Sequence, residues 1–240
     1  GKLMRDPGFF LNRYAPTTTH IAFLDESPHK LADFIYAREV DLNSQYEFPT
    51  QVQRSEVEAD LDTKLELLLP LTSMTDRTLI CKTESNWSAY ITNGINGGDV
   101  HSQPHYLASI LKVRSVGIIM VADVPGGQPG SMQFVYRDGT QTKEIMTRHG
   151  PYAEMPSRSI AAHKESRWEF HAHGEPLPFE DVDRYSAKKI KDRLTTEMIE
   201  QYCAALGIHI FDPSFFAGYG CMIKSHCPPN ARVLEKFHNL

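Results

Sequence analysis

The sequence predicts an α+β protein that folds as a single domain over residues 1–240. Short segments of alternating apolar and polar residues, typical of half-buried strands, recur through the middle of the chain. The last third instead carries apolar residues at helical spacing. No charge run or Ser/Gly-rich linker separates these regions. We therefore expect one domain with a mainly antiparallel sheet, one β-α-β segment and a pair of helices near the C-terminus.

The N-terminal part predicts one strand and two helices. Residues 17–24 alternate well enough for a strand, and a helix follows with Ser27 as its N-cap and a proline at its first position. A second helix is expected with Asp60 as its N-cap and with its end before Pro70, because a proline disfavours helical geometry in the residue before it. Residues 42–58 stay ambiguous, since a proline interrupts their strand-like pattern.

The core is expected to form around residues 77–124, the stretch with the densest apolar content. Residues 78–82 and 87–92 alternate around a short turn and predict a hairpin. A glycine-rich loop leads to a helix with Ser102 as its cap, and residues 116–122 form an unbroken apolar run. This order of elements predicts the β-α-β segment.

Antiparallel hairpins are expected next. An Asp-Gly dipeptide at 138–139, the strongest short hairpin signal in the chain, lies between the predicted strands 132–136 and 140–146. Residues 158–162 and 167–172 predict two more strands.

The last third predicts the helical pair. Acidic residues from Glu180 to Asp183 and basic residues from Lys188 to Arg193 match the dipole of one helix. A second helix starts after Thr195 or Thr196 and ends at Gly207, which suits a left-handed C-terminal residue.

Composition excludes several classes of function. The net charge of −5 argues against nucleic-acid binding, and no apolar run reaches the length of about 20 residues that spans a bilayer. We expect a cytoplasmic protein with reduced thiols, although a leader removed before Gly1 stays open. The four cysteines show no CxxC spacing: Cys81, Cys203, Cys221 and Cys227.

Glu169, His171 and His173 form one candidate site. In a strand these side chains project from the same face, and two imidazoles with a carboxylate can bind a divalent metal ion. The competing interpretation, which we favour, is the polar, solvent-facing side of a strand. We therefore predict no cofactor.

Two weaker candidates follow from local composition. The glycines before Asp99 could present amide groups to an anion at the start of the next helix, but no phosphate-loop lysine or dinucleotide spacing is present. Cys221, His226 and Cys227 could form a thiolate–imidazole site, but no orienting group follows at a recognisable spacing. We favour a structural role for both.

The last candidate is a binding surface made of Trp87, Tyr90, Asn93, Asn96 and Asp99. Aromatic and asparagine side chains in and beside a loop are typical of protein interfaces. Alternatively, Trp87 packs in the core and the loop is only a connector; both interpretations stay open.

No GxSxG, HExxH or paired-carboxylate motif indicates catalysis. The sequence therefore predicts a non-catalytic, soluble bacterial protein that binds another protein, for example a toxin-neutralising (immunity) protein. The alternative is a metal-dependent enzyme using Glu169, His171 and His173, in which the ion acts as a Lewis acid or lowers the pKa of a bound water. The sequence does not specify an oligomeric state.

Overall fold

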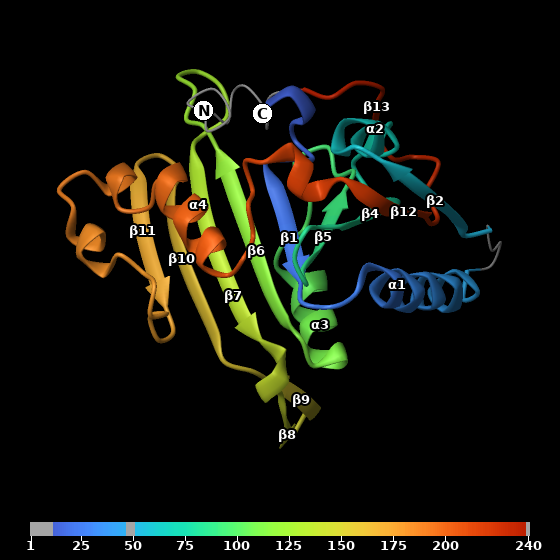
Figure 1. Cartoon of the computed structure of the whole chain (residues 1–240), viewed down its shortest axis with the longest axis horizontal. Helices are drawn as coiled ribbons and strands as arrows, with labels where there is room; N and C mark the ends of the chain where they lie inside the picture. Colours follow the sequence, from blue (N-terminus) through green and yellow to red (C-terminus); the bar gives the residue numbers. More distant parts are fainter. Residues whose placement is uncertain (1–11, 47–50, 239–240) are drawn as a thin grey trace. The chain divides into compact units, whose positions relative to one another are not determined.

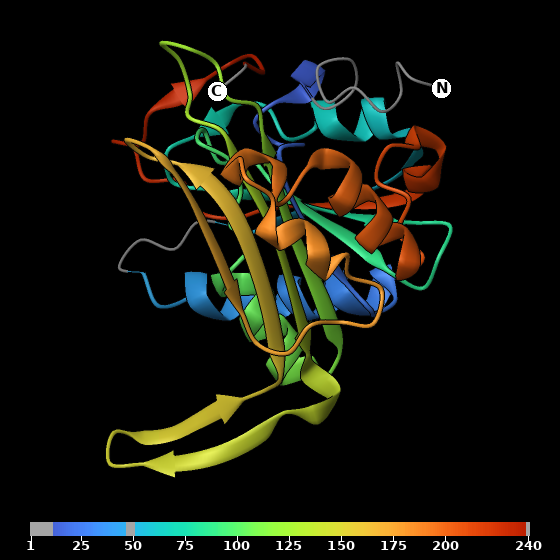
Figure 2. The ribbon, with the colours of Figure 1, turned by 90° about the vertical axis from the view of Figure 1, so that its left-hand side faces the viewer.

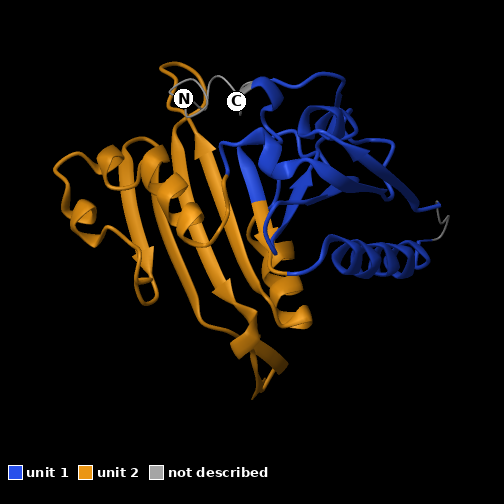
Figure 3. Ribbon diagram, in the orientation of Figure 1, with its two compact units in different colours: residues 1–21, 26–99, 210–240 blue, residues 22–25, 100–209 orange. Residues whose placement is uncertain are grey.

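The structure is a computed structural model that describes residues 12–46 and 51–238 (Figure 1). The chain forms two compact units (Figure 3). Unit 1 belongs to residues 1–21, 26–99 and 210–240, and unit 2 to residues 22–25 and 100–209. The α+β class and the mainly antiparallel sheet are confirmed, whereas the single domain stays a prediction. No helix in the described part of the chain is both long and apolar enough to cross a bilayer.

Unit 1 is built on antiparallel strands in the order β5-β4-β12-β2. These strands are β2 (Gln53–Ala59), β4 (Arg77–Lys82), β5 (Ser88–Thr92) and β12 (Gly218–Lys224). A short pair joins β3 (Leu71–Thr72) to β13 (Val233–Leu234). The remaining elements are α1 (Pro28–Asn43), α2 (Leu61–Glu66), η2 (Asn12–Tyr14) and η6 (Pro213–Phe216).

Two N-caps that the sequence predicts in unit 1 are confirmed. Ser27 caps α1, where its side chain accepts a hydrogen bond from the Lys30 amide, and Asp60 caps α2 by accepting from the Thr63 amide. The ambiguous residues 42–58 contain the end of α1 and the edge strand β2; Pro49 lies outside the described residues.

Unit 2 contains antiparallel strands in the order β11-β10-β7-β6. These are β6 (Arg114–Val121), β7 (Ser131–Asp138), β10 (Ser157–Lys164) and β11 (Trp168–His173). Strand β1 (His20–Leu24) passes from unit 1 into unit 2, where it is the neighbour of β6. Two α-helices, α3 (Ser102–Leu111) and α4 (Thr196–Ala205), belong to unit 2.

One face of the unit 2 sheet is packed with aromatic rings. Phe134 of β7 is fully buried, and its ring contacts that of Tyr202 from α4 with centroids 5.6 Å apart. Phe170 of β11 contacts Tyr185 at 5.4 Å. Because side chains alternate along a strand, the neighbours of Phe170 in β11, Glu169 and His171, point to the opposite face.

The predicted hairpin at Asp138-Gly139 is wrong. β7 pairs with β6 and β10, and after the short helix η3 (Gly139–Gln141) the chain forms a separate ribbon of β8 (Lys143–Thr147) and β9 (Gly150–Glu154). The Asp138 carboxylate accepts from the Thr140 amide and so starts a 3₁₀ turn instead of a strand-to-strand turn. Gly139 is required by close packing, since a Cβ there would clash with the Ala108 carbonyl oxygen.

Only one of the two predicted C-terminal helices is an α-helix. Residues 180–194 form two short 3₁₀ helices, η4 (Val182–Ser186) and η5 (Ile190–Asp192). Glu180 does not offset a helix dipole at the surface, because its buried carboxylate pairs with Arg158. Helix α4 is confirmed, with Thr195 as its cap and Gly207 at φ +84° after its end. Ser102 proves to be the first residue of α3 and not its cap.

Candidate metal centre

The pairing of β10 with β11 brings two histidines and one glutamate together. In this register His163 lies directly opposite Glu169, and Ala161 lies opposite His171. Residues directly opposite one another on antiparallel strands project to the same face. His163, Glu169 and His171 therefore share the face of the sheet that points away from the aromatic side.

The ligand atoms of these three residues converge. The His163 Nε2 lies 3.7 Å from the Glu169 Oε2, and the His171 Nε2 lies 3.4 Å from the same oxygen. One ligand atom from each residue falls within 4.8 Å of the other two. The side chains are 22%, 38% and 49% exposed in chain order, so the cluster is open to solvent on one side.

These distances fit a transition-metal ion. Metal–ligand bonds of about 2.1 Å at a tetrahedral angle separate the ligand atoms by about 3.4 Å. Both histidine-to-glutamate distances are close to that value. The Glu165 Oε1 lies 3.9 Å from the His163 Nε2, but Glu165 does not belong to the group whose ligand atoms all lie within 4.8 Å of one another.

His173 is not part of this cluster, which corrects the predicted set of ligands. Its ring stacks on that of His171 with centroids 6.3 Å apart, but it lies four residues from Glu169 along an extended strand. At about 3.3 Å per residue this separation is about 13 Å, too far for a shared ion. The neighbouring strand supplies the missing ligand, His163, at the position facing Glu169.

The second nitrogen of His163 has an unusual environment. The buried Nδ1 atom finds no hydrogen-bond partner among the described residues. In metal sites this nitrogen usually donates to a carboxylate or carbonyl, which orients the ring and raises its basicity. We therefore expect a weaker site than one with a complete outer shell of hydrogen bonds.

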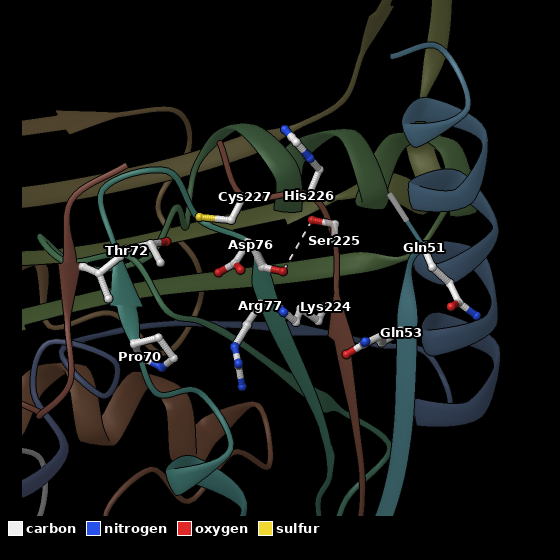
Figure 4. A pocket seen from close by; sticks show the side chains of 11 residues that line it. Gln51, Gln53, Pro70, Thr72, Asp76, Arg77, Lys224, Ser225, His226 and Cys227 are labelled. Atoms are coloured by element: carbon white, nitrogen blue, oxygen red, sulfur yellow. Dashed lines mark hydrogen bonds between the residues drawn. The ribbon is translucent and has the colours of Figure 1, made fainter. Parts of the chain in front are cut away.

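The cysteine–histidine candidate falls in a different place. His226 and Cys227 line a cavity of about 400 Å³ in unit 1, together with Asp76, Arg77 and other residues (Figure 4). Burial and the nearby Asp76 carboxylate raise the pKa of the Cys227 thiol, which disfavours a reactive thiolate. Cys221 is fully buried in β12 and does not line this cavity.

The glycines of the proposed anion loop have a structural explanation. Gly97 has φ +98°, and a Cβ at this position would clash with the His20 ring. Glycine is therefore favoured here for two reasons, the positive φ and the close approach of the His20 ring.

The predicted binding surface is largely buried. Trp87, Tyr90 and Asn93 belong to the core of unit 1, and only Asn96 and Asp99 are exposed. Asn93 accepts hydrogen bonds from the amides of Asp76 and Arg77 and donates to the Asp76 carboxylate. It therefore organises a buried turn, and these five residues do not form one continuous surface. Protein binding itself stays a prediction.

Comparison with known proteins adds no assignment, because no protein family, curated protein or solved structure matches the chain.

Proposed function

We propose that this protein binds a divalent transition-metal ion, zinc in the first instance, through His163, Glu169 and His171. The observation that supports this proposal is the convergence of two imidazole nitrogens and one carboxylate oxygen within 4.8 Å. Imidazole with carboxylate suits zinc and its first-row neighbours, whereas magnesium and calcium prefer all-oxygen ligands.

The arrangement leaves room for chemistry at the ion. Three protein ligands leave at least one position of a tetrahedral ion for water or for another ligand. The partial exposure of all three side chains opens this position to solvent. An ion with such a position lowers the pKa of its bound water or polarises a carbonyl, so a hydrolytic role follows if a substrate reaches it.

The experiment compares two histidines of the same β10–β11 face. Zinc binding to the whole chain is measured by isothermal titration calorimetry for the wild type, His163→Ala and His173→Ala. We expect one zinc ion per chain in the wild type, affinity lowered by about 100-fold or more in His163→Ala, and wild-type affinity in His173→Ala.

His173→Ala is the matched control, because it removes an imidazole of the same face that stacks on His171 but supplies no ligand atom to the cluster. Equal affinities in all three proteins would reject the proposal, and so would loss of binding in His173→Ala alone. Magnesium serves as a second control and is expected not to bind at zinc-saturating concentrations.

A further inference from the structure

The ribbon of β8 and β9 has no core of its own. The two strands form a separate sheet (Figures 1 and 2), and Figure 2 shows this ribbon projecting beyond the ends of β7 and β10. Every residue of β8 is exposed, including Ile145 and Met146, and Tyr152 of β9 is exposed as well. An isolated two-stranded ribbon is marginally stable in water, so this element gains from a further strand.

The two edges of the ribbon differ. Its loop contains two residues between the paired Thr147 and Gly150, and such a loop is closed by a hydrogen-bonded pair. Alternation along the ladder then directs the backbone N–H and C=O groups of Glu144 and Met146 away from β9, toward the free edge of β8. On β9 the residues whose backbone groups point outward are Pro151 and Ala153.

Pro151 blocks the β9 edge, because proline has no N–H to offer to another strand. The β8 edge has no such protection, since Glu144 and Met146 both present an N–H and a C=O. An edge whose N–H and C=O groups are directed outward is a template for pairing with another strand.

We propose that β8 is a self-association edge at which two copies of this chain pair antiparallel about a two-fold axis at Ile145. In this register Glu144 faces the partner's Met146, and Met146 faces the partner's Glu144. The outward N–H and C=O groups of both residues then meet their complements in the second copy. The two ribbons become one continuous sheet.

The side chains fit this register. Ile145 faces the partner's Ile145, and Tyr152, its neighbour on the same face, extends the apolar row on both sides. Glu144 lies diagonally beside the partner's Glu144 on one side and the partner's Arg148, in the turn after β8, on the other, so the opposite-charge contact with Arg148 offsets the like-charge one. Moving the axis to Glu144 would instead oppose two carboxylates, which is destabilising.

The contact is small, which determines the expected strength. Pairing confined to two ribbons buries less than the roughly 1,200 Å² of a standard interface, so we expect a reversible dimer that dissociates on dilution. Sedimentation velocity of the full chain over a concentration series measures this equilibrium.

The test compares two exposed isoleucines of unit 2. Ile145 is 41% exposed and Ile110, on α3, is 51% exposed, so neither Ile→Lys substitution disturbs the core. We expect Ile145→Lys to raise the dimer dissociation constant by about tenfold or more, because two ammonium groups then face each other across the axis. Ile110→Lys should retain the wild-type constant.

A charge exchange tests the register. Glu144→Arg and Arg148→Glu should each weaken the dimer, and the double variant should restore it by recreating the opposite-charge pair across the axis. A protein that is monomeric at every concentration would overturn the proposal. The same holds for a dimer with unchanged affinity in Ile145→Lys, or with no recovery in the double variant.

Discussion

The ion pair between Arg158 and Glu180 should be a major determinant of stability in unit 2. Their side chains are 6% and 0% exposed. The guanidinium donates from Nη2 to one carboxylate oxygen at 2.8 Å and from Nε to the other at 3.0 Å. The Leu177 amide and the Tyr185 hydroxyl donate to the same carboxylate, at 2.7 and 2.8 Å.

Removing one partner leaves a buried charge without compensation. We expect Glu180→Ala to lower the free energy of unfolding by about 3–5 kcal/mol, the usual cost of breaking a buried pair. Arg158→Met combined with Glu180→Leu replaces both charges by apolar groups. The double variant should therefore lose less free energy of unfolding than the two single substitutions lose when their effects are added. Urea denaturation followed by circular dichroism measures these free energies.

The pair between Lys164 and Asp123 supplies the control. It also involves β10, but both side chains are about one-third exposed and the atoms lie 3.4 Å apart. Lys164→Met removes this pair and keeps the hydrogen bond from the Gly130 amide to Asp123, so it should cost about 1 kcal/mol or less. The reasoning is refuted if Glu180→Ala costs no more than Lys164→Met, or if the effects at Arg158 and Glu180 simply add.

Three further predictions follow from burial. In the folded protein a thiol reagent should label Cys227 alone, because Cys81, Cys203 and Cys221 are buried. After denaturation the reagent should label all four cysteines. Rapid labelling of more than one thiol in the folded state would contradict this prediction. Burial raises the pKa of Cys81 from 9.0 to about 11, so its contribution to stability is present below pH 9 and declines as the pH rises toward 11. Urea titrations should show this decline, and they should show a smaller one in Cys81→Ala. Gly139→Ala should cost about 1–3 kcal/mol through overpacking, because the new methyl group would press on the Ala108 and Val113 carbonyl oxygens; an unchanged urea midpoint would contradict the packing.

Local periodicity predicted the elements whose partners lie nearby in sequence. Residues 78–82 and 87–92 form β4 and β5 almost within the predicted bounds, and Thr195 and Gly207 delimit α4 as expected. The failures involve long-range contacts. Asp138-Gly139 has the composition of a hairpin, but pairing of β7 with β10 and packing of Gly139 against the Ala108 carbonyl decide its conformation.

The misplaced binding surface has a similar cause. Alternation assigned Trp87 and Tyr90 to opposite faces of a strand, and an exposed face was expected for at least one of them. Every residue of β5 is buried, so both faces of this strand are covered. A single segment carries no information about which elements cover its second face.

The predicted set of metal ligands contained His173 where the structure has His163. The sequence predicted the adjacent strands 158–162 and 167–172, and one more residue of pairing places His163 opposite Glu169. A search along one strand found His173, because it follows the two-residue period. The ligand from the neighbouring strand requires the register, which alternation alone does not fix.

Zinc K-edge X-ray absorption of the metal-loaded protein is the most direct test of the metal proposal, because it reports the atoms bound to the ion. The proposed site predicts two imidazole nitrogens and at least one oxygen at about 2.0–2.2 Å, with one imidazole lost in His163→Ala. A first shell containing sulfur at about 2.3 Å, or one without imidazole, would contradict it.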